Sequence, residues 1–194
     1  TIGKEMMRLS KMVFKGQDLI SIARPFLERL AELVNETVLL GVREYDVIKV
    51  IDVIEAKGDL KISSPIGTKL SMTAGAVGKI FLSAMSNEDV VAYLKEKGLP
   101  HYTESSITDV DAFIEEIEKT RKMGYSLDIG EYLKGIRAVA TLIRQDDTPI
   151  GAVWFVGFSN SMIDERLHHI IRNLKHTADQ ISARLSFSLQ VDRE

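Results

Sequence analysis

The feature that most constrains the fold is the stretch GIRAVATLIRQDDTPIGAVWFVGF, residues 135–158, in which two apolar runs flank a short polar turn. Two such runs around a turn predict an antiparallel β-hairpin. Side chains alternate between the two faces of a strand, so every second residue of each hairpin strand shares one face. The residues that share a face are Ile136, Ala138 and Ala140 in the first strand and Ala152, Trp154 and Val156 in the second. The face that carries Trp154, the only tryptophan, is therefore either core or the wall of a pocket.

Helical spacing of apolar residues marks several segments on either side of this hairpin. They are an amphipathic arm in residues 1–15, a helix in 17–36, a helix in 71–85, helices from Ser86 to Gly98 and from Thr108 to Gly124, and a long helix through Leu185. We expect Leu33, Ala84 and Val110 to face inward. Pro25 lacks a backbone donor, so we expect a kink or a new helix there.

Strand signals occupy three further places. TVLLGVREYDVIKVIDVIEA predicts two strands with a turn at residues 43–46, residues 57–70 predict a loop with a short strand, and residues 125–129 predict one more strand. The order is a helix, two or three strands, three helices, three strands and a helix. Runs of strands separated from runs of helices favour an α+β fold: an antiparallel sheet with helices packed on it.

Composition excludes several classes of function. A net charge of −3 lacks the basic excess of a nucleic-acid-binding module. No apolar run approaches the ~20 residues that cross a bilayer, so no membrane partner is expected. Cysteine is absent, which removes disulfides, thiolate nucleophiles and cysteine metal ligands. No signal peptide is recognisable, and we expect a cytoplasmic protein.

No motif for catalysis or for a cofactor is present. The chain has no GxxxxGK[ST], GxGxxG or GxSxG segment. His168 and His169 point to different sides of a helix, and His176 lies too far along for the same turn, so solvated histidines are expected rather than a metal site. We therefore expect no enzyme, no cofactor and no metal.

Five segments in order resemble the effector-binding domain of the IclR (isocitrate lyase regulator) family of bacterial and archaeal transcription regulators. They are TIGKEMMRLSKM, ARPFLERLAELVNETVLLGV, PIGTKLSMTAGAVGKIFLSAMS, RKMGYSLDIGEYLKGIRAVATLI and PIGAVWFVG. The resemblance runs from about residue 1 to about residue 187. It implies a GAF/PAS-like curved antiparallel sheet with a small-molecule pocket on its concave face.

The resemblance also implies a domain organisation. Residues 1–15 would be a linker helix from a preceding winged helix-turn-helix DNA-binding domain, 16–187 the effector-binding domain, and 188–194 a C-terminal tail. The partners it implies are a small-molecule effector, with a carboxylic acid as a candidate class, and a second copy in a homodimer or homotetramer. Operator DNA would be bound only through the preceding domain.

The segment TAGAVGK begins a helix. If Thr73 caps it, the amides of residues 75–77 lack intrahelical partners, and such a helix N-terminus binds a carboxylate. The resemblance gives this role to the amides of Ala76 and Val77. Alternatively, Gly75 and Gly78 merely permit close packing of the helix on the sheet.

Asp128, in GYSLDIGE, stands where the family has an aspartate that faces the effector. Alternation puts Ser126 and Asp128 on one face of this strand. A buried carboxylate needs a partner, which a ligand hydroxyl or a neighbouring amide could supply. Glu131 keeps the last acid of the family pattern, whereas Gly130 departs from it.

The family commonly has a cysteine at Ala138 and serines at Trp154 and Val156, and these polar groups hold small oxoacids. Here carbon replaces them, except for the indole N–H of Trp154, so we expect weak binding of glyoxylate or pyruvate and an effector that is larger or more apolar. Trp154 either stacks on that effector or fills the pocket as core. Ile136 shares the pocket face, and Leu70 is expected to supply an apolar wall.

Three functions remain open. The first is the sensing and oligomerisation domain of a regulator. The second is a stand-alone GAF-like module that binds a metabolite, or an enzyme that relies on Asp128 and Glu131. The third is a dimerisation scaffold whose pocket is plugged by Trp154.

Overall fold

The computed structural model describes residues 19–191, with side chains described for 19–187. A helix of residues 19–34 comes first. The other elements are β1 (Thr37–Glu44), β2 (Val47–Ile54), β3 (Lys69–Ser71), α2 (Gly75–Leu82), α3 (Asn87–Lys97), α4 (Val110–Met123), β4 (Ser126–Ile129), β5 (Ile136–Gln145), β6 (Thr148–Phe158) and α5 (Asp164–Val191). This order confirms the predicted one. The arm predicted over residues 1–15 lies outside the described residues.

The strands form one six-stranded antiparallel sheet in the order β3-β2-β1-β6-β5-β4. The predicted hairpin is β5–β6, in which Ala138 pairs with Val156 and Ala140 with Trp154. Strand β1 pairs with β6 and places Leu39 opposite Trp154. Strands β1 and β6, the first and last of the described strands, thus lie next to each other at the centre of the sheet. Trp154 lies between Leu39 of β1 and Ala140 of β5.

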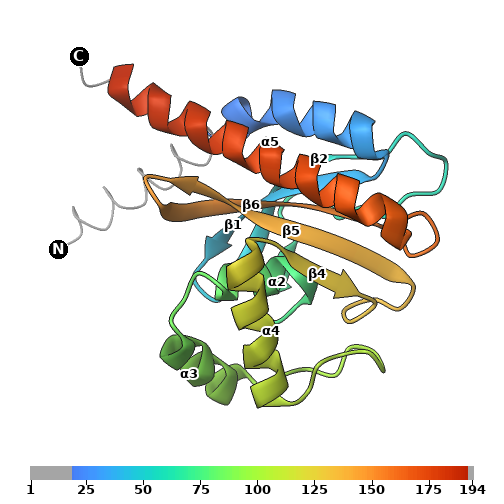
Figure 1. The fold of residues 1–194 in the computed structure, drawn as a ribbon, viewed down its shortest axis with the longest axis vertical. Coiled ribbons are helices and arrows are strands. Elements are labelled where there is room, and N and C mark those ends of the chain that lie inside the picture. Colours follow the sequence, from blue (N-terminus) through green and yellow to red (C-terminus); the bar gives the residue numbers. More distant parts are fainter. Residues whose placement is uncertain (1–18, 192–194) are drawn as a thin grey trace.

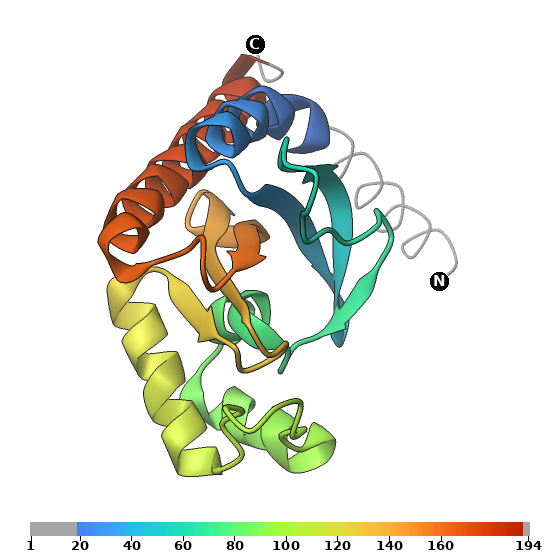
Figure 2. The same ribbon diagram turned by 90° about the vertical axis from the view of Figure 1, so that its right-hand side faces the viewer.

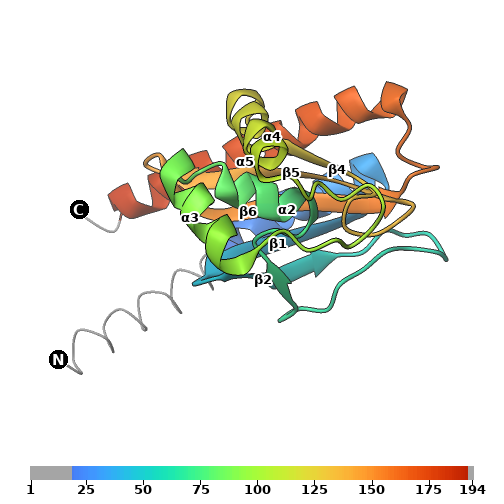
Figure 3. The same ribbon diagram turned by 90° about the horizontal axis from the view of Figure 1, so that it is seen from below.

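Helices cover both faces of this sheet (Figures 1 and 2). The helix of residues 19–34 and α5 lie side by side on one face, and α2, α3 and α4 lie on the other, as the view from below also shows (Figure 3). Each face has its own buried cluster. Val153 and Phe155 belong to the cluster under α5, whereas Trp154 belongs to the cluster under α2. The α+β class and the curved antiparallel sheet are confirmed.

Helix boundaries are largely as expected, since Ser86 accepts a bond from the Asp89 amide and Gly98 ends α3. Helix α4 is capped by Asp109 instead of the expected Thr108, and it ends at Gly124 in the left-handed conformation. The helix of residues 19–34 runs through Pro25 without a break, so no new helix begins there, and the kink stays a prediction.

Three residues expected to face inward are exposed. The buried stripe of the first helix runs through Leu30, Ala31 and Val34, which turns Leu33 to solvent. Ala84 lies beyond the end of α2 and is exposed. Val110 is the first residue of α4, before the buried stripe of that helix begins at Phe113, and it is exposed.

Within residues 19–191, no helix is both long and apolar enough to cross a membrane.

Candidate functional site

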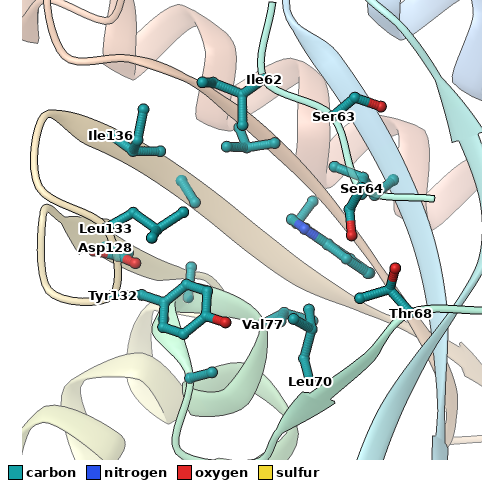
Figure 4. A pocket seen from close by; sticks show the side chains of 17 residues that line it. Ile62, Ser63, Ser64, Thr68, Leu70, Val77, Asp128, Tyr132, Leu133 and Ile136 are labelled. Carbon is teal, nitrogen blue, oxygen red and sulfur yellow. The ribbon is translucent and has the colours of Figure 1, made fainter. Parts of the chain in front are cut away.

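A cavity of about 240 Å³ lies on the face of the sheet that carries α2. Its walls come from β1, β5 and β6, the first turn of α2, the loop before β3 and the loop after β4 (Figure 4). All eight residues predicted for the effector site line it. They are Leu70, Ala76, Val77, Asp128, Ile136, Ala138, Trp154 and Val156. That they bind an effector stays a prediction.

The N-terminus of α2 opens onto the cavity. The first helical bond runs from the Gly78 amide to the Ala74 carbonyl, and the amides of residues 75–77 have no partner among the described residues. The condition that Thr73 caps this helix is not met, although the amides lack partners all the same. The N-cap is Ala74, without a side-chain bond, because the Thr73 hydroxyl lies 2.9 Å from that of Ser71. Three residues with unpaired amides therefore line the cavity, and a helix N-terminus of this kind favours an anion.

The two glycines of α2 lie close to different parts of the chain. A Cβ at Gly78 would collide with the carbonyl of Met72, so this glycine permits close packing of the helix on the chain before it. Gly75 has a φ of +55°, which glycine adopts readily. A Cβ there would lie 2.6 Å from Oδ2 of Asp128. Both glycines thus permit close packing, Gly78 against the chain before α2 and Gly75 against Asp128.

Asp128 is buried at the end of β4, on the same face as Ser126 as predicted. The amide of Glu131 donates to its Oδ1 over 2.6 Å, so a neighbouring amide is the partner that the carboxylate needs. Burial raises the pKa of Asp128, whereas the Glu131 amide and the charge of Lys79 lower it. Asp128 therefore both closes the turn after β4 and presents a carboxyl group to the cavity.

Lys79, on α2, is a buried cation that sequence reasoning missed. Its Nζ donates to both carboxylate oxygens of Glu131, at 2.7 and 2.8 Å, and lies 3.6 Å from Oε1 of Glu116. Burial raises the pKa of Glu131, and the ammonium of Lys79 lowers it. Its position between Gly78 and Ile80 was the available signal, because a lysine in such an apolar stretch needs a buried acid.

Trp154 forms one wall and is 4% exposed. A Cβ on Gly41, in the neighbouring strand β1, would lie 2.9 Å from two carbons of the indole. The ring thus lies over a strand position that has no side chain. The cavity remains beside it, so the indole lines this space without filling it.

Two loops complete the cavity, and sequence reasoning did not name Ser63, Ser64, Tyr132 or Leu133, which line it from these loops. Figure 4 shows Ser63 and Ser64 on one side and Tyr132 and Leu133 on the opposite side. The Tyr132 ring packs edge-on against that of Tyr102, with centroids 4.9 Å apart. These loops lack periodic patterns, which is why no strand or helix signal could place them.

Hydrogen bonds from residues of another loop hold the loop after β4 in place. Thr103 donates through its hydroxyl to the carbonyl of Gly130 over 2.7 Å, and Ser106 donates to that of Glu131 over 2.7 Å. With the Asp128 bond, these contacts fix the backbone that carries Tyr132. The cavity therefore has one wall built by hydrogen bonds to a remote loop.

Metal chemistry has no visible basis within the described part of the chain. No group of three or more potential ligands from histidine and acidic residues occurs there. His168, His169 and His176 are exposed on α5, as expected of solvated histidines.

Solved structures share this fold. The structure of an IclR homologue from Microbacterium hydrocarbonoxydans, complexed with 4-hydroxybenzoate, matches with a TM-score of 0.79 at 20% identity, over 88% of this chain and 69% of that one. At this identity the likeness shows the fold alone. The Thermotoga maritima IclR structure matches with a TM-score of 0.82 at 26% identity, over 93% of this chain and 74% of that one.

Sequence comparison agrees with the fold. The HTH-type transcriptional repressor AllR of Escherichia coli K12 is 26% identical over 185 residues, which cover 95% of this chain and 68% of that protein. Residues 11–183 match the family model described as the C-terminal part of the bacterial transcriptional regulator IclR. The chain therefore belongs to the IclR family of transcriptional regulators, as an example of its C-terminal effector-binding domain.

Proposed function

We propose that this domain senses a carboxylic acid whose body is larger and more apolar than that of glyoxylate or pyruvate. The observation that carries the proposal is the lining of the 240 Å³ cavity, which is apolar around Ala138, Trp154 and Val156 and polar at the α2 terminus. Burying apolar ligand surface contributes ~25 cal/mol per Å². A small oxoacid has little such surface and would meet carbon where it needs hydrogen bonds.

The acid group fits the first turn of α2. Its oxygens would accept from the unpaired amides of Ala76 and Val77, with the helix dipole adding to the attraction. The apolar body would then lie along β5 and β6, against Trp154. An indole beside an aromatic ring gains ~0.5–1.5 kcal/mol beyond area burial.

The position of Asp128 narrows the chemical class of effector that we propose. Oδ2 of Asp128 lies 2.6 Å from the point where a Cβ of Gly75 would be, so an acid group at the amides of Ala76 and Val77 would lie beside Asp128 and would be held best when Asp128 is protonated, the form that burial favours. A hydroxyl on the ligand could donate to Asp128, whose Oδ1 is already used by the Glu131 amide. A hydroxy-substituted aromatic acid carries both groups. 4-Hydroxybenzoate, present in the Microbacterium hydrocarbonoxydans homologue, is such a compound.

The rest of the regulator follows from the family. In this proposal residues 16–187 form the sensor, 1–15 connect it to a preceding winged helix-turn-helix domain that binds operator DNA, and 188–194 are a tail. The domains assemble as a homodimer or homotetramer. Effector binding acts by its different affinity for two arrangements of the DNA-binding domains.

The test is a thermal-shift series on this chain with 4-hydroxybenzoate, benzoate, an aliphatic acid and glyoxylate. A ligand at a hundred times its Kd adds about 2.7 kcal/mol of stability, or roughly 5–10 °C in Tm for a domain of this size. We expect the largest shift with the aromatic acids, and a weaker one in Trp154→Ala and Asp128→Ala. Phe155→Leu is the matched control, because Phe155 is buried on the opposite face.

Two results would contradict the proposal. A larger shift with glyoxylate than with benzoate would show that the apolar lining does not select the effector. If no acid shifts the parent but Trp154→Ala gains binding, the indole excludes ligands and the domain is a scaffold. The open cavity beside Trp154 argues against that second outcome.

A further inference from the structure

A second cavity, of about 270 Å³, lies where the C-terminal ends of α2 and α4 meet β5 and α5. Ile80 and Ser83 line it from α2, and Lys175 and Ser182 line it from α5. None of the described residues lines both cavities. It is therefore a separate space at the other end of the same helix, and the effector proposal makes no use of it.

The floor of this cavity holds an unexplained polar group. Thr120 lines the cavity from α4, is fully buried, and its hydroxyl oxygen has no hydrogen-bond partner among the described residues. Buried hydroxyls are nearly always paired, and an exception indicates a missing water, ion or ligand. Thr141, beside it, already donates to the carbonyl of Gly124 over 2.8 Å. The Thr120 hydroxyl is thus an unpaired donor buried in the wall of this cavity.

The walls carry an excess of positive charge. Arg121, Arg144 and Lys175 line the cavity, against the single acid Asp179. The guanidinium of Arg121 is committed, since it donates to the carbonyls of Ser83 and Met85 and to the Asn87 side chain. Arg121 therefore contributes mainly a fixed positive charge, because its N–H groups are already used.

Lys175 and Arg144 keep donors to spare. Lys175 uses one N–H on the carbonyl of Met123, at 3.0 Å, and Arg144 donates from Nη1 to the carbonyl of Asp147, at 2.8 Å. An ammonium has three donors and a guanidinium five, so both can bind a further acceptor without losing these contacts. The helix-end carbonyls nearby are covered by Arg121 and Lys175, which leaves the space suited to an anion.

We propose that this cavity binds a small oxyanion, a phosphate or carboxylate group, held by Lys175 and Arg144 with the hydroxyl of Thr120 donating at its floor. The proposal is independent of the effector cavity. Charge-assisted hydrogen bonds from the cations supply the attraction. The threonine supplies a contact that only a ligand deep in the cavity would make.

The test is isothermal titration calorimetry of this chain with sodium phosphate and, separately, with sodium succinate, at an ionic strength held constant with sodium chloride. We expect saturable binding of one probe, and which probe binds distinguishes a phosphate from a carboxylate ligand. Lys175→Met should weaken that binding at least tenfold. Thr120→Val should weaken it several-fold without lowering Tm, because the lost hydroxyl has no protein partner.

Lys119→Met is the matched control, since it removes a cation from the same region of α4 at a residue outside the cavity. Trp154→Ala should leave the affinity unchanged, which separates this proposal from the proposed effector. The proposal is overturned if neither probe binds saturably, or if Lys119→Met weakens binding as much as Lys175→Met. It is also overturned if Thr120→Val binds as tightly as the parent.

Discussion

The indole of Trp154 lies directly over Gly41, with two of its ring carbons 2.9 Å from the point where a Cβ of residue 41 would be. The same Cβ would be 2.9 Å from the carbonyl oxygen of Lys49. Real Cβ atoms essentially never approach other atoms so closely. Gly41 thus sets the depth at which the ring lies in the sheet, and with it the position of one cavity wall.

Gly41→Ala should therefore move the indole into the cavity. Overpacking of this kind costs about 1–3 kcal/mol of stability. We expect affinity for 4-hydroxybenzoate to fall at least tenfold, with a smaller effect on smaller acids. Urea unfolding and ligand titration measure the two effects separately, and Gly41→Ala/Trp154→Phe should regain part of the affinity.

Gly151→Ala is the control for crowding. A Cβ there would lie 3.0 Å from the carbonyl oxygen of Gly41 and 3.1 Å from a methyl carbon of Leu19, on the face away from the cavity. Its stability should fall while its order of preference among acids stays that of the parent. Equal losses of affinity in both variants would mean that crowding of the sheet, not the indole, is responsible.

The pH dependence of stability should report on Asp128. Burial raises its pKa above the ordinary 3.8, so the folded chain holds a proton that the unfolded chain has released. This contribution to stability is complete below pH 3.8 and is lost as the pH rises through the folded pKa. Asp128→Asn avoids the burial of charge and can still accept from the Glu131 amide.

We therefore expect Asp128→Asn to be at least as stable as the parent at pH 7, with the two curves converging towards pH 4. Urea unfolding at pH 4, 5.5 and 7 checks this. A variant that loses stability relative to the parent as the pH rises would show that the ionised carboxylate is stabilising.

Lys79→Met should destabilise the domain in a pH-dependent way. Breaking a buried ion pair costs about 3–5 kcal/mol, and the partial exposure of Glu131 reduces this to about 2–3 kcal/mol at pH 7. Because burial raises the pKa of Glu131, that group can take up a proton in mild acid once Lys79 is gone. The loss should shrink at pH 5.

Unfolding of the parent and of Lys79→Met at both pH values measures this difference. Lys97→Met, at an exposed ion pair with Asp46, should change nothing measurable. An equal loss for Lys79→Met at pH 5 and pH 7 would mean that lost packing of the lysine stem, and not an unpaired acid, dominates.

Alternation predicted which residues of β5 and which of β6 share a face, but not the observed pairing, because the register shifts between Ile143 and Arg144. That pairing places Ala138, Trp154 and Val156 on the cavity face as expected. The resemblance to the family supplied Asp128 and the α2 terminus, which alternation alone could not have distinguished from an ordinary turn and an ordinary helix start.

What escaped prediction depends on contacts between distant segments. Lys79 finds Glu131 only through the fold, 52 positions along the chain. The loop with Ser63 and Ser64 has no periodicity, so its approach to the cavity leaves no local signal. Leu33 fits a helical stripe by spacing, but the position of the sheet favours Val34.

A single layer of β-strands separates the two buried clusters, so each strand contributes side chains to both. Trp154 borders the cavity, and its chain neighbours Val153 and Phe155 are completely buried against the helix layer on the other side. A ligand that displaced this part of β6 perpendicular to the sheet would drive those two side chains into the packing under α5. In that case the wall of the cavity would itself couple the two helix layers.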